Sequence, residues 1–378
     1  MKNIISIIGN FLTLINKLIP KKKKLIVLYS NLGFRDNVEA FYTYLIDNNY
    51  HEKYKIVVSS NDYKSLKHVE KIKYVSCFIG IFYFLISKYF FYSFGKYNIM
   101  PSKDQCVVNL WHGMPLKTIG NLEKGKENNK YDYFTYVIST SKYFDNVMMK
   151  SFKCNRERIM NCGQPRTDYF YKKNQTLFNK YNKVAIWMPT FRTSDILQES
   201  NTSNEKNILP IIKNQKDFSK INSIFKENNS ILLIKLHPIQ SKNNLTFSNQ
   251  SNIKFIDEEY LNSNKINLYS LLSETDFLIT DYSSVYFDYL LLNKPILFTL
   301  EDLNDYKKNR GLNFENLEDI MPGPKALTLN SFLQELNNLI NDKDSFYKER
   351  KNVNKILNEY STKNNCKNIC DICGIKGE

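Results

Sequence analysis

The chain has 378 residues, 42% of them hydrophobic and 14% aromatic, which excludes an intrinsically disordered protein and allows two domains that each bury a core. Its formal net charge of +15 favours an anionic partner, which can be a membrane surface, a nucleic acid or a phosphorylated substrate. A lysine-rich coding bias accounts for part of this charge, so charge alone selects none of these partners, and no recognition motif supports nucleic acid.

Residues 1–24 form a basic, amphipathic segment. Their apolar side chains recur at helical spacing, and four lysines follow at positions 21–24. The apolar stretch is too short, and too often interrupted by Asn and Lys, to span a bilayer. The segment can therefore lie on an anionic membrane surface, or it can pack against its own domain with the lysines in solvent.

Strand and helix patterns alternate from residue 25 onward. The run 74–94 is the most apolar in the chain, but Lys88, Gly80 and Ser87 weaken it as a membrane span. We expect a helix followed by a short strand there, and a membrane-facing helix is the alternative. The predicted elements of this half are strands at 25–29, 54–59, 89–92, 107–111, 137–140 and 158–161, and helices at 37–47, 64–71 and 142–150.

The second half repeats this alternation after a boundary near residue 175. Its predicted elements are strands at 183–188, 231–236, 253–256, 277–280 and 296–299, and helices at 211–227, 268–273, 329–341 and 345–372. We therefore expect an α/β protein with two facing doubly wound domains, at 25–175 and 176–378, and an active site in the cleft between them. The last helix can pack back on the first domain.

A polar turn lies between the strand at 277–280 and the helix that follows it. The turn contains Asp281, Ser283 and Ser284, and either serine is suited to cap the helix. The unpaired amides at the helix start, its positive dipole end and the two hydroxyls can together hold a phosphate. Asp288 lies one turn further along the same face, where it can reach a group attached to that phosphate. The alternative is an ordinary capped helix in an α/β core.

Two histidines follow predicted buried strands, one in each half of the chain. His112 comes directly after Trp111, with Gly113 and Pro115 shaping the loop, and His237 follows the strand at 231–236. Ligands of open α/β sheets bind at the carboxyl ends of strands, where a histidine can act as a general acid or base near neutral pH. A buried structural histidine is the alternative.

Seven segments between about residues 105 and 325 stand in a distinctive order and spacing. Six are short, namely Trp111-His-Gly-Met-Pro-Leu-Lys117, Gly163-Gln-Pro-Arg166, Pro189-Thr-Phe-Arg192, His237-Pro238, Thr280-Asp-Tyr-Ser-Ser284 and Phe287-Asp-Tyr-Leu-Leu-Leu-Asn-Lys-Pro295, and the seventh is the longer segment Tyr306–Pro324. Together they resemble the CDP-glycerol glycerophosphotransferase family, whose members assemble teichoic acids and capsule polymers. The resemblance implies a GT-B-like pair of Rossmann-like domains, with the acceptor on the N-terminal side and the donor on the C-terminal side.

The resemblance also implies roles for individual residues. His112 is the implied base that takes a proton from an acceptor hydroxyl, which attacks CDP-glycerol and releases CMP. His237 is implied to stabilise the charge on the leaving phosphate. The implied contacts of the donor and its phosphates are Trp111, Gly113, Met114, Pro115, Arg166, Pro189, Thr190, Arg192, Lys235, Ser283, Ser284 and Asp288. The family usually has Thr where this chain has Met114, which affects the expected donor or acceptor preference.

The implied reaction needs no tightly bound metal or other cofactor, and a requirement for a divalent cation stays open. Near the C-terminus, Cys366, Cys370 and Cys373 have the spacing of an apolar helix face and lack a fourth ligand nearby, so we predict no metal site there. The seven cysteines lack the spacing of a secreted domain and indicate a reducing compartment.

The implied partners are CDP-glycerol, a lipid-linked or polymeric acceptor and the cytoplasmic face of the cell membrane, with the enzyme bound there peripherally. The length is closer to family members that add one or a few units than to the longer polymerases. Three alternatives stay open. The donor can be CDP-ribitol or another polyol, the protein can be a UDP-sugar glycosyltransferase of the same fold, or it can be a non-catalytic protein that binds an anionic polymer.

Overall fold

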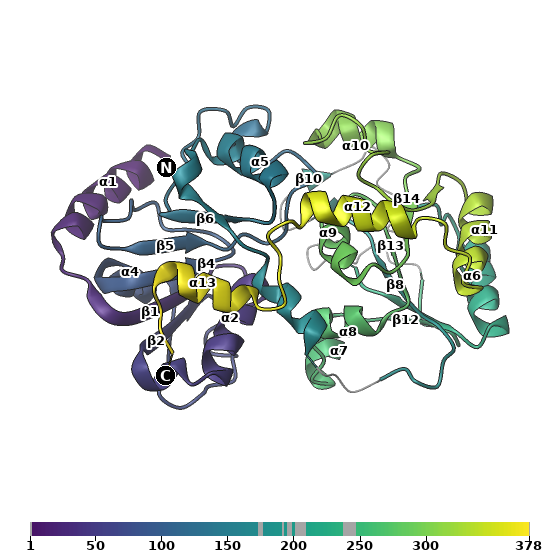
Figure 1. The fold of residues 1–378 in the computed structure, drawn as a ribbon, viewed down its shortest axis with the longest axis horizontal. Helices are drawn as coiled ribbons and strands as arrows, with labels where there is room; N and C mark the ends of the chain where they lie inside the picture. Colours follow the sequence, from purple (N-terminus) through teal and green to yellow (C-terminus); the bar gives the residue numbers. More distant parts are fainter. Residues whose placement is uncertain are drawn as a thin grey trace. The chain divides into compact units, whose positions relative to one another are not determined.

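The structure is a computed structural model that describes residues 2–172, 177–190, 193–194, 199–200, 209–236 and 247–377 (Figure 1). The chain forms two compact units. Unit 1 comprises Met1–Met114, Gly120–Asp168 and Glu359–Glu378, and unit 2 comprises Pro115–Ile119 and Tyr169–Asn358. Each unit contains its own parallel sheet with helices packed against it, which confirms the predicted α/β class.

The sheet of unit 1 consists of β1 Lys22–Ser30, β2 Lys55–Ser60, β3 Lys73–Val75, β4 Ser87–Tyr92, β5 Cys106–Asn109, β6 Tyr136–Ser139 and β7 Ile159–Asn161. The strands are parallel and lie in the order β3-β2-β1-β4-β5-β6-β7. Ile26, Val27 and Leu28 of β1 are fully buried, because both faces of a parallel sheet are covered. The strand order reverses between β1 and β4, which makes this pair the switch point of the sheet.

Two helices of unit 1 begin at serine caps, Ser76 and Ser141, as their sequences favour. The C-terminal helix α13 (Asn365–Cys373) packs against α2 (Asp36–Asp47). Burial raises the pKa of the Cys370 thiol to about 12, so this thiol stays protonated at neutral pH. The other helices are α1 Lys2–Leu18, α3 Tyr50–Lys53, α4 Cys77–Ile86 and α5 Lys142–Phe152, with short 3-10 turns at Gly120–Leu122 and Arg156–Arg158.

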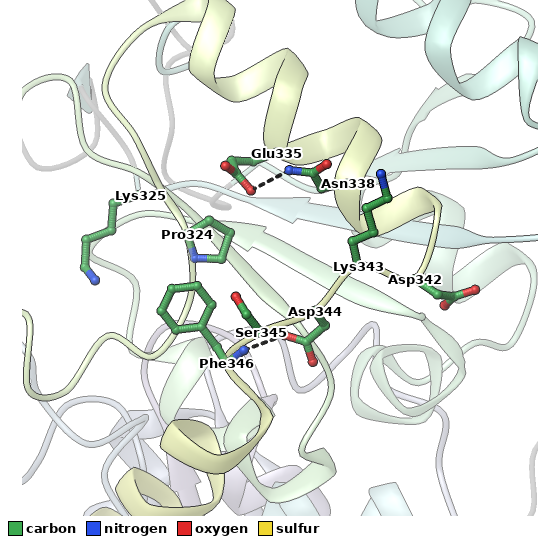
Figure 2. A pocket seen from close by; sticks show the side chains of 9 residues that line it. All are labelled: Pro324, Lys325, Glu335, Asn338, Asp342, Lys343, Asp344, Ser345 and Phe346. Carbon is green, nitrogen blue, oxygen red and sulfur yellow. Dashed lines mark hydrogen bonds between the residues drawn. The ribbon is translucent and has the colours of Figure 1, made fainter.

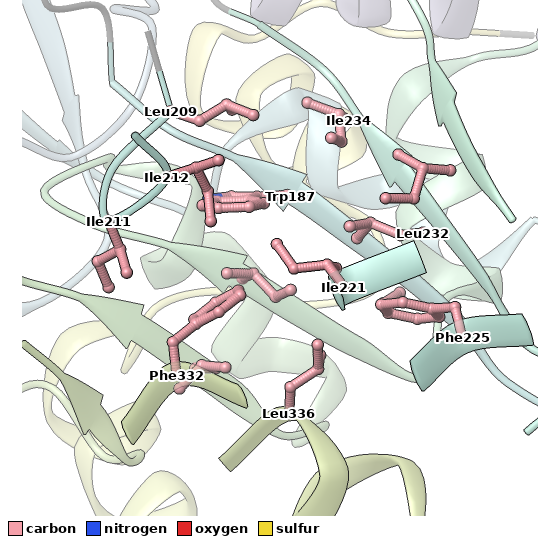
Figure 3. Packing of buried hydrophobic residues seen from close by; sticks show 14 of the residues in the cluster. Trp187, Leu209, Ile211, Ile212, Ile221, Phe225, Leu232, Ile234, Phe332 and Leu336 are labelled. Atoms are coloured by element: carbon pink, nitrogen blue, oxygen red, sulfur yellow. The ribbon is translucent and has the colours of Figure 1, made fainter. Parts of the chain in front are cut away.

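The sheet of unit 2 consists of β8 Val184–Met188, β11 Ile231–Ile234, β12 Ile253–Phe255, β13 Phe277–Thr280, β14 Ile296–Thr299 and β15 Lys325–Ala326. The strands are parallel in the order β12-β11-β8-β13-β14-β15, so the switch point lies between β8 and β13. Trp187 of β8 is fully buried, and its ring centroid lies 5.1 Å from that of Phe332 on the covering helix α11 (Leu329–Ile340) (Figure 3).

The remaining elements of unit 2 are helices and short connections. The helices are α6 Gln215–Glu227, α7 Glu258–Ser263, α8 Leu268–Glu274, α9 Val285–Tyr289, α10 Leu303–Arg310 and α12 Tyr347–Leu357. A two-stranded antiparallel pair, β9 Thr193–Ser194 and β10 Glu199–Ser200, stands apart from the main sheet. The 3-10 turns are η3 Pro165–Tyr171, which spans the boundary of the units, and η4 Leu290–Leu292.

Two predicted helices are wrong. Residues 64–71 form turns, because the Val69 amide donates to the Tyr74 hydroxyl at 3.0 Å and does not continue a helix. The helix expected at 345–372 is broken into α12 and α13, and the chain passes from unit 2 to unit 1 at that break. The Asn358 side chain fixes the start of the break by donating to the Phe287 carbonyl at 2.6 Å.

The apolar run 74–94 forms the end of β3, helix α4 and strand β4, as predicted. Among the described residues, no helix has the length and apolar character needed to cross a membrane.

Candidate active site

The turn that carries His112 begins where β5 ends at Asn109, two residues earlier than predicted. The Asn109 side chain accepts the Trp111 N–H at 3.0 Å. Trp111 has a φ of 50° and Gly113 a φ of 121°. A left-handed conformation is rare for a bulky residue and persists only where the surroundings enforce it. The turn is therefore a constrained element that fixes the direction of His112 at the carboxyl end of the sheet.

The His112 imidazole is half-buried and held on several sides. Its ring centroid lies 4.3 Å from that of Trp111 and 4.7 Å from that of Phe94, and both contacts are stacked. Its Nδ1 lies 3.3 Å from the Ser93 carbonyl oxygen. Because a carbonyl only accepts, Nδ1 is the nitrogen that carries hydrogen in the neutral ring, and Nε2 carries the lone pair. This tautomer is the one that a general base needs.

Asn37, which was not predicted as a site residue, supports this turn from the start of α2. The residue is fully buried. Its Nδ2 donates to the carbonyls of Leu110 at 2.9 Å and Trp111 at 3.2 Å and to the Gln164 side chain at 2.7 Å, while its Oδ1 accepts the Arg166 N–H at 3.2 Å. The only signal in the sequence was a polar residue in the first turn of a helix that follows a buried strand.

Arg166, predicted to bind phosphate, forms an ion pair in unit 1. Its side chain is 6% exposed, and its Nη1 lies 2.8 and 2.7 Å from the two carboxylate oxygens of Asp36. Asp36 has a φ of 67°, and its Oδ1 also accepts the N–H of Asn37 at 2.7 Å. A phosphate that binds Arg166 must therefore share its guanidinium with Asp36.

The turn after β13 brings together two predicted parts of the donor site in unit 2. Asp281 is fully buried, and its carboxylate accepts the Thr190 N–H at 2.9 Å and the Thr190 hydroxyl at 3.1 Å. Thr190 follows β8, which is the neighbour of β13 at the switch point of the sheet. The contact joins Pro189-Thr190 to the turn at 281–284, although the two segments are 91 residues apart.

Of the two serines suited to cap α9 (Val285–Tyr289), Ser284 makes no capping hydrogen bond with its side chain. Ser283 accepts the Val285 N–H instead, at a long 3.4 Å. The helix α9 has only five residues, which weakens the argument from a helix dipole. Both serines are half-buried.

Asp288 and Lys235 both have protein partners. The Asp288 side chain is 1% exposed, and its carboxylate accepts the Tyr269 hydroxyl at 2.7 Å. Lys235 is 4% exposed, and its Nζ lies 2.8 Å from Glu258 Oε1. In this structure, Asp288 and Lys235 are therefore buried side chains of unit 2 that bond to other residues of the same unit.

The remaining predicted residues fall into two groups. His237 and Arg192 lie outside the described residues. Met114 and Pro115 are buried, and the division between the units falls between them. The segment that starts at Pro115 is held within unit 2 by Asn313, whose Nδ2 donates to the carbonyls of Pro115 at 3.0 Å and Lys117 at 2.7 Å.

A surface pocket in unit 2, with a volume of about 670 Å³, contains none of the predicted site residues (Figure 2). Its wall carries charges of both signs, and the hydrogen bond from Arg350 holds the pKa of its Asp344 below the ordinary value. The lining residues are Pro324, Lys325, Glu335, Asn338, Asp342, Lys343, Asp344, Ser345 and Phe346.

Within the described part of the chain, no three His, Cys, Asp or Glu side chains converge as metal ligands.

Comparisons with known proteins identify the family of the chain. A sequence model of the family described as CDP-Glycerol:Poly(glycerophosphate) glycerophosphotransferase matches residues 11–373. The teichoic acid glycerol-phosphate primase of Bacillus subtilis (strain 168) is 28% identical over 283 residues, which are 71% of this chain and 67% of that protein. The teichoic acid poly(glycerol phosphate) polymerase of Bacillus spizizenii is 27% identical over 377 residues, 91% of this chain and 89% of that protein.

Teichoic acid ribitol-phosphate primases and polymerases are also similar to the chain. Among solved structures, the wall teichoic acid polymerase TagF matches with a TM-score of 0.72 at 22% identity, over 94% of this chain and 89% of that chain. This match confirms the predicted GT-B-like fold class.

Proposed function

Because the chain belongs to the CDP-glycerol:poly(glycerophosphate) glycerophosphotransferase family, we propose that it transfers glycerol phosphate from CDP-glycerol to an acceptor hydroxyl and releases CMP. The acceptor is a lipid-linked molecule or a growing polymer in teichoic acid or capsule synthesis. The teichoic acid primases and polymerases among the similar proteins support polyol-phosphate transfer as the reaction class.

The observation that carries this proposal is the hydrogen bond from the His112 ring to the Ser93 carbonyl. It leaves the lone pair of the neutral ring on Nε2. In the proposed reaction, Nε2 takes the proton of the acceptor hydroxyl while that oxygen attacks the phosphorus that bears glycerol. The bond from this phosphorus to the oxygen of CMP breaks, and its electron pair leaves with CMP. Stacking on Phe94 and Trp111 holds the ring in place for this proton transfer.

On the donor side, we propose that the turn at 281–284 binds the phosphates of CDP-glycerol. Ser283 and Ser284 offer hydroxyls that are half-buried at the carboxyl end of β13. Thr190 directs both of its donors to Asp281, so it shapes the turn. His237 keeps its proposed role as the group that stabilises the departing phosphate.

We further propose that unit 1 docks on the cytoplasmic face of the membrane. α1 exposes Ile7, Phe11, Leu14 and Leu18 by 61% to 83% of their surface, at spacings that place them along one side of the helix. The neighbouring helix α4 exposes 82% of Phe78. The exposed lysines that begin β1 follow directly. Apolar helix faces beside lysines are typical of proteins bound to anionic interfaces.

Vesicle sedimentation tests the membrane contact. Wild type should sediment with vesicles that contain anionic phosphatidylglycerol, and the double variant Phe11→Glu/Leu18→Glu should stay in the supernatant, because both changes place carboxylates on the apolar side of α1. Neutral phosphatidylcholine vesicles provide the matched control for the lysines. Sedimentation of the double variant equal to that of wild type would contradict this docking surface.

A donor panel tests the reaction itself. CMP release is measured with CDP-glycerol and CDP-ribitol, UDP release with UDP-glucose, and membranes of the producing cell supply the acceptor. We expect acceptor-dependent CMP release from CDP-glycerol. The ribitol-phosphate enzymes among the similar proteins favour CDP-ribitol as the second candidate, and its exclusive turnover would keep the mechanism but replace the donor. No turnover of any donor by the folded protein would contradict the proposed function.

A further inference from the structure

Arg35 lies at the switch point of the sheet in unit 1. It follows β1 and directly precedes α2, and its neighbour in space, Phe94, follows β4. β1 and β4 are the adjacent strands between which the strand order reverses. Open α/β sheets bind ligands in the crevice beyond the carboxyl ends of such a pair.

Arg35 is linked to His112 through a ring. Its guanidinium carbon lies 5.1 Å from the centroid of Phe94, and that centroid lies 4.7 Å from the centroid of His112. These two distances place the guanidinium carbon within about 10 Å of the imidazole centre, whichever face of Phe94 it covers. The cation–π contact also restricts the long side chain, so an anion bound there meets an arginine that is already positioned.

The charge of Arg35 is not neutralised within the described part of the chain. No carboxylate among the described residues forms an ion pair with it. The adjacent Asp36 directs its carboxylate to Arg166, and the nearby Asp62 accepts the Phe34 N–H at 3.1 Å. Arg35 is half-buried, and its guanidinium therefore keeps its planar set of donors for an outside anion.

We propose that Arg35 binds the last phosphodiester of an acceptor chain that already ends in glycerol phosphate. This inference rests on the proposed function, because it takes the acceptor hydroxyl to lie at His112. In a glycerol phosphate end, a three-carbon chain separates the free hydroxyl oxygen from the phosphorus by about 6 Å when extended. Hydrogen bonds of about 3 Å at each end extend this reach to about 12 Å, which exceeds the limit of about 10 Å, so a bent glycerol phosphate end can bridge Arg35 and His112.

The consequence is a preference among acceptors. An acceptor that ends in glycerol phosphate places one negative charge at Arg35 when its hydroxyl reaches His112. An acceptor that ends in a neutral sugar or alcohol places no charge there and gains nothing from the guanidinium. The side chain therefore selects for chains that have already received a unit, which is the selectivity of an enzyme that extends a polymer.

Two synthetic acceptors separate charge from shape. One is an alkyl-linked tri(glycerol phosphate), and the other is the same compound with its last phosphodiester methylated to a neutral triester. The variants are Arg35→Gln, which keeps a planar polar group and loses the charge, and Arg35→Lys, which keeps the charge and loses the planar donors. Steady-state CMP release gives KM for each acceptor and for CDP-glycerol, and thermal unfolding checks that each variant is folded.

We expect Arg35→Gln to raise the KM of the charged acceptor by about 10- to 100-fold, the range of a lost hydrogen bond between charged groups. The KM of CDP-glycerol and the KM of the neutral acceptor should stay within twofold of wild type, and Arg35→Lys should fall between wild type and Arg35→Gln for the charged acceptor. Calorimetric binding of the charged acceptor without donor should show the same order of affinities.

Other outcomes overturn the inference. Equal losses with both acceptors would mean that Arg35 only supports Phe94 and His112, and unchanged KM values would mean that it touches no acceptor. Wild type that discriminates poorly between the two acceptors would also contradict the proposed phosphate contact. Failure of wild type to release CMP with either acceptor would refute the proposed function. The inference about Arg35 would then also be refuted, unless calorimetry still showed charge-dependent binding of the acceptor that Arg35→Gln weakens.

Discussion

The two turns at the carboxyl ends of β5 and β13 are built from opposite kinds of support. The His112 turn is held by neutral amides, with the buried Asn37 donating to two backbone carbonyls. The turn at 281–284 is held by a buried carboxylate, Asp281, which accepts both donors of Thr190. Asn37 lies in a segment far along the chain from the turn that it supports. Asp281 lies within its own turn but bonds to Thr190, which is 91 residues away.

The difference has a chemical reason. A buried charge next to an imidazole changes the stability of its protonated form, whereas neutral amides hold the turn without doing so. A turn that only has to hold its shape can use a carboxylate, which makes stronger hydrogen bonds than an amide oxygen does. Substitutions of the two supporting residues should therefore affect different properties, which gives three ways to test the comparison.

The largest loss of stability is expected for Asp281→Ala. Removing the carboxylate leaves the amide and the hydroxyl of Thr190 without their acceptor, at a cost of roughly 1–3 kcal/mol for each buried group. We expect the free energy of unfolding to fall by about 3 kcal/mol and the KM of CDP-glycerol to rise, as measured by urea denaturation and CMP release. Asp281→Asn is the matched variant and should retain about half of the lost stability. Wild-type stability for Asp281→Ala would refute this support.

Asn37→Ala should cost less stability but more of the turnover rate. The carbonyls of Leu110 and Trp111 lose a shared donor, at about 1–2 kcal/mol of stability. Because the turn then loosens, we expect kcat to fall by about tenfold or more while the KM of CDP-glycerol stays close to that of wild type. Asn37→Asp has the same shape and should also lose activity, since a carboxylate cannot donate. An equal loss in both kinetic constants would argue against a role specific to His112.

The smallest effect is expected for Ser283→Ala. Its hydrogen bond to Val285 N–H is long, at 3.4 Å, so the loss of stability should stay below about 1 kcal/mol. If the hydroxyl contacts a donor phosphate, the KM of CDP-glycerol should still rise several-fold. Ser284→Ala should leave the free energy of unfolding unchanged, because Ser284 makes no capping bond. If neither variant raises the KM of CDP-glycerol, the two serines do not bind the donor.

Much of the fold follows from local patterns in the sequence. The apolar runs at 277–280 and 296–299 coincide with β13 and β14, since buried parallel strands are continuously apolar. The helix predicted at 345–372 was wrong, because α12 ends at Leu357 and the chain passes from unit 2 to unit 1 before α13 begins. Helical periodicity does not show where a chain leaves one unit for another.

In the candidate site, the residue expected to act on the substrate was easier to predict from the sequence than the residues that support the two turns. His112 stood out because a rare residue type followed a strand, and its stacking and hydrogen bond agree with a role as a base. Asn37 and Asp281 were not selected as site residues, because their partners are 73 and 91 residues away in the chain. Such supporting contacts depend on the strand order, which neither composition nor spacing gives. The predicted roles of His237 and Arg192 stay predictions, as both residues lie outside the described part.

We propose that His112 acts as the base and does not bind the donor. A comparison of wild type with His112→Gln tests this role through two quantities, CDP-glycerol affinity by calorimetry and acceptor-dependent CMP release. We expect the affinity to stay within twofold, while release falls by about 10²- to 10⁴-fold, the contribution typical of a general base. Release at the wild-type rate, or a loss of affinity that accounts for the whole loss of release, would contradict the claim.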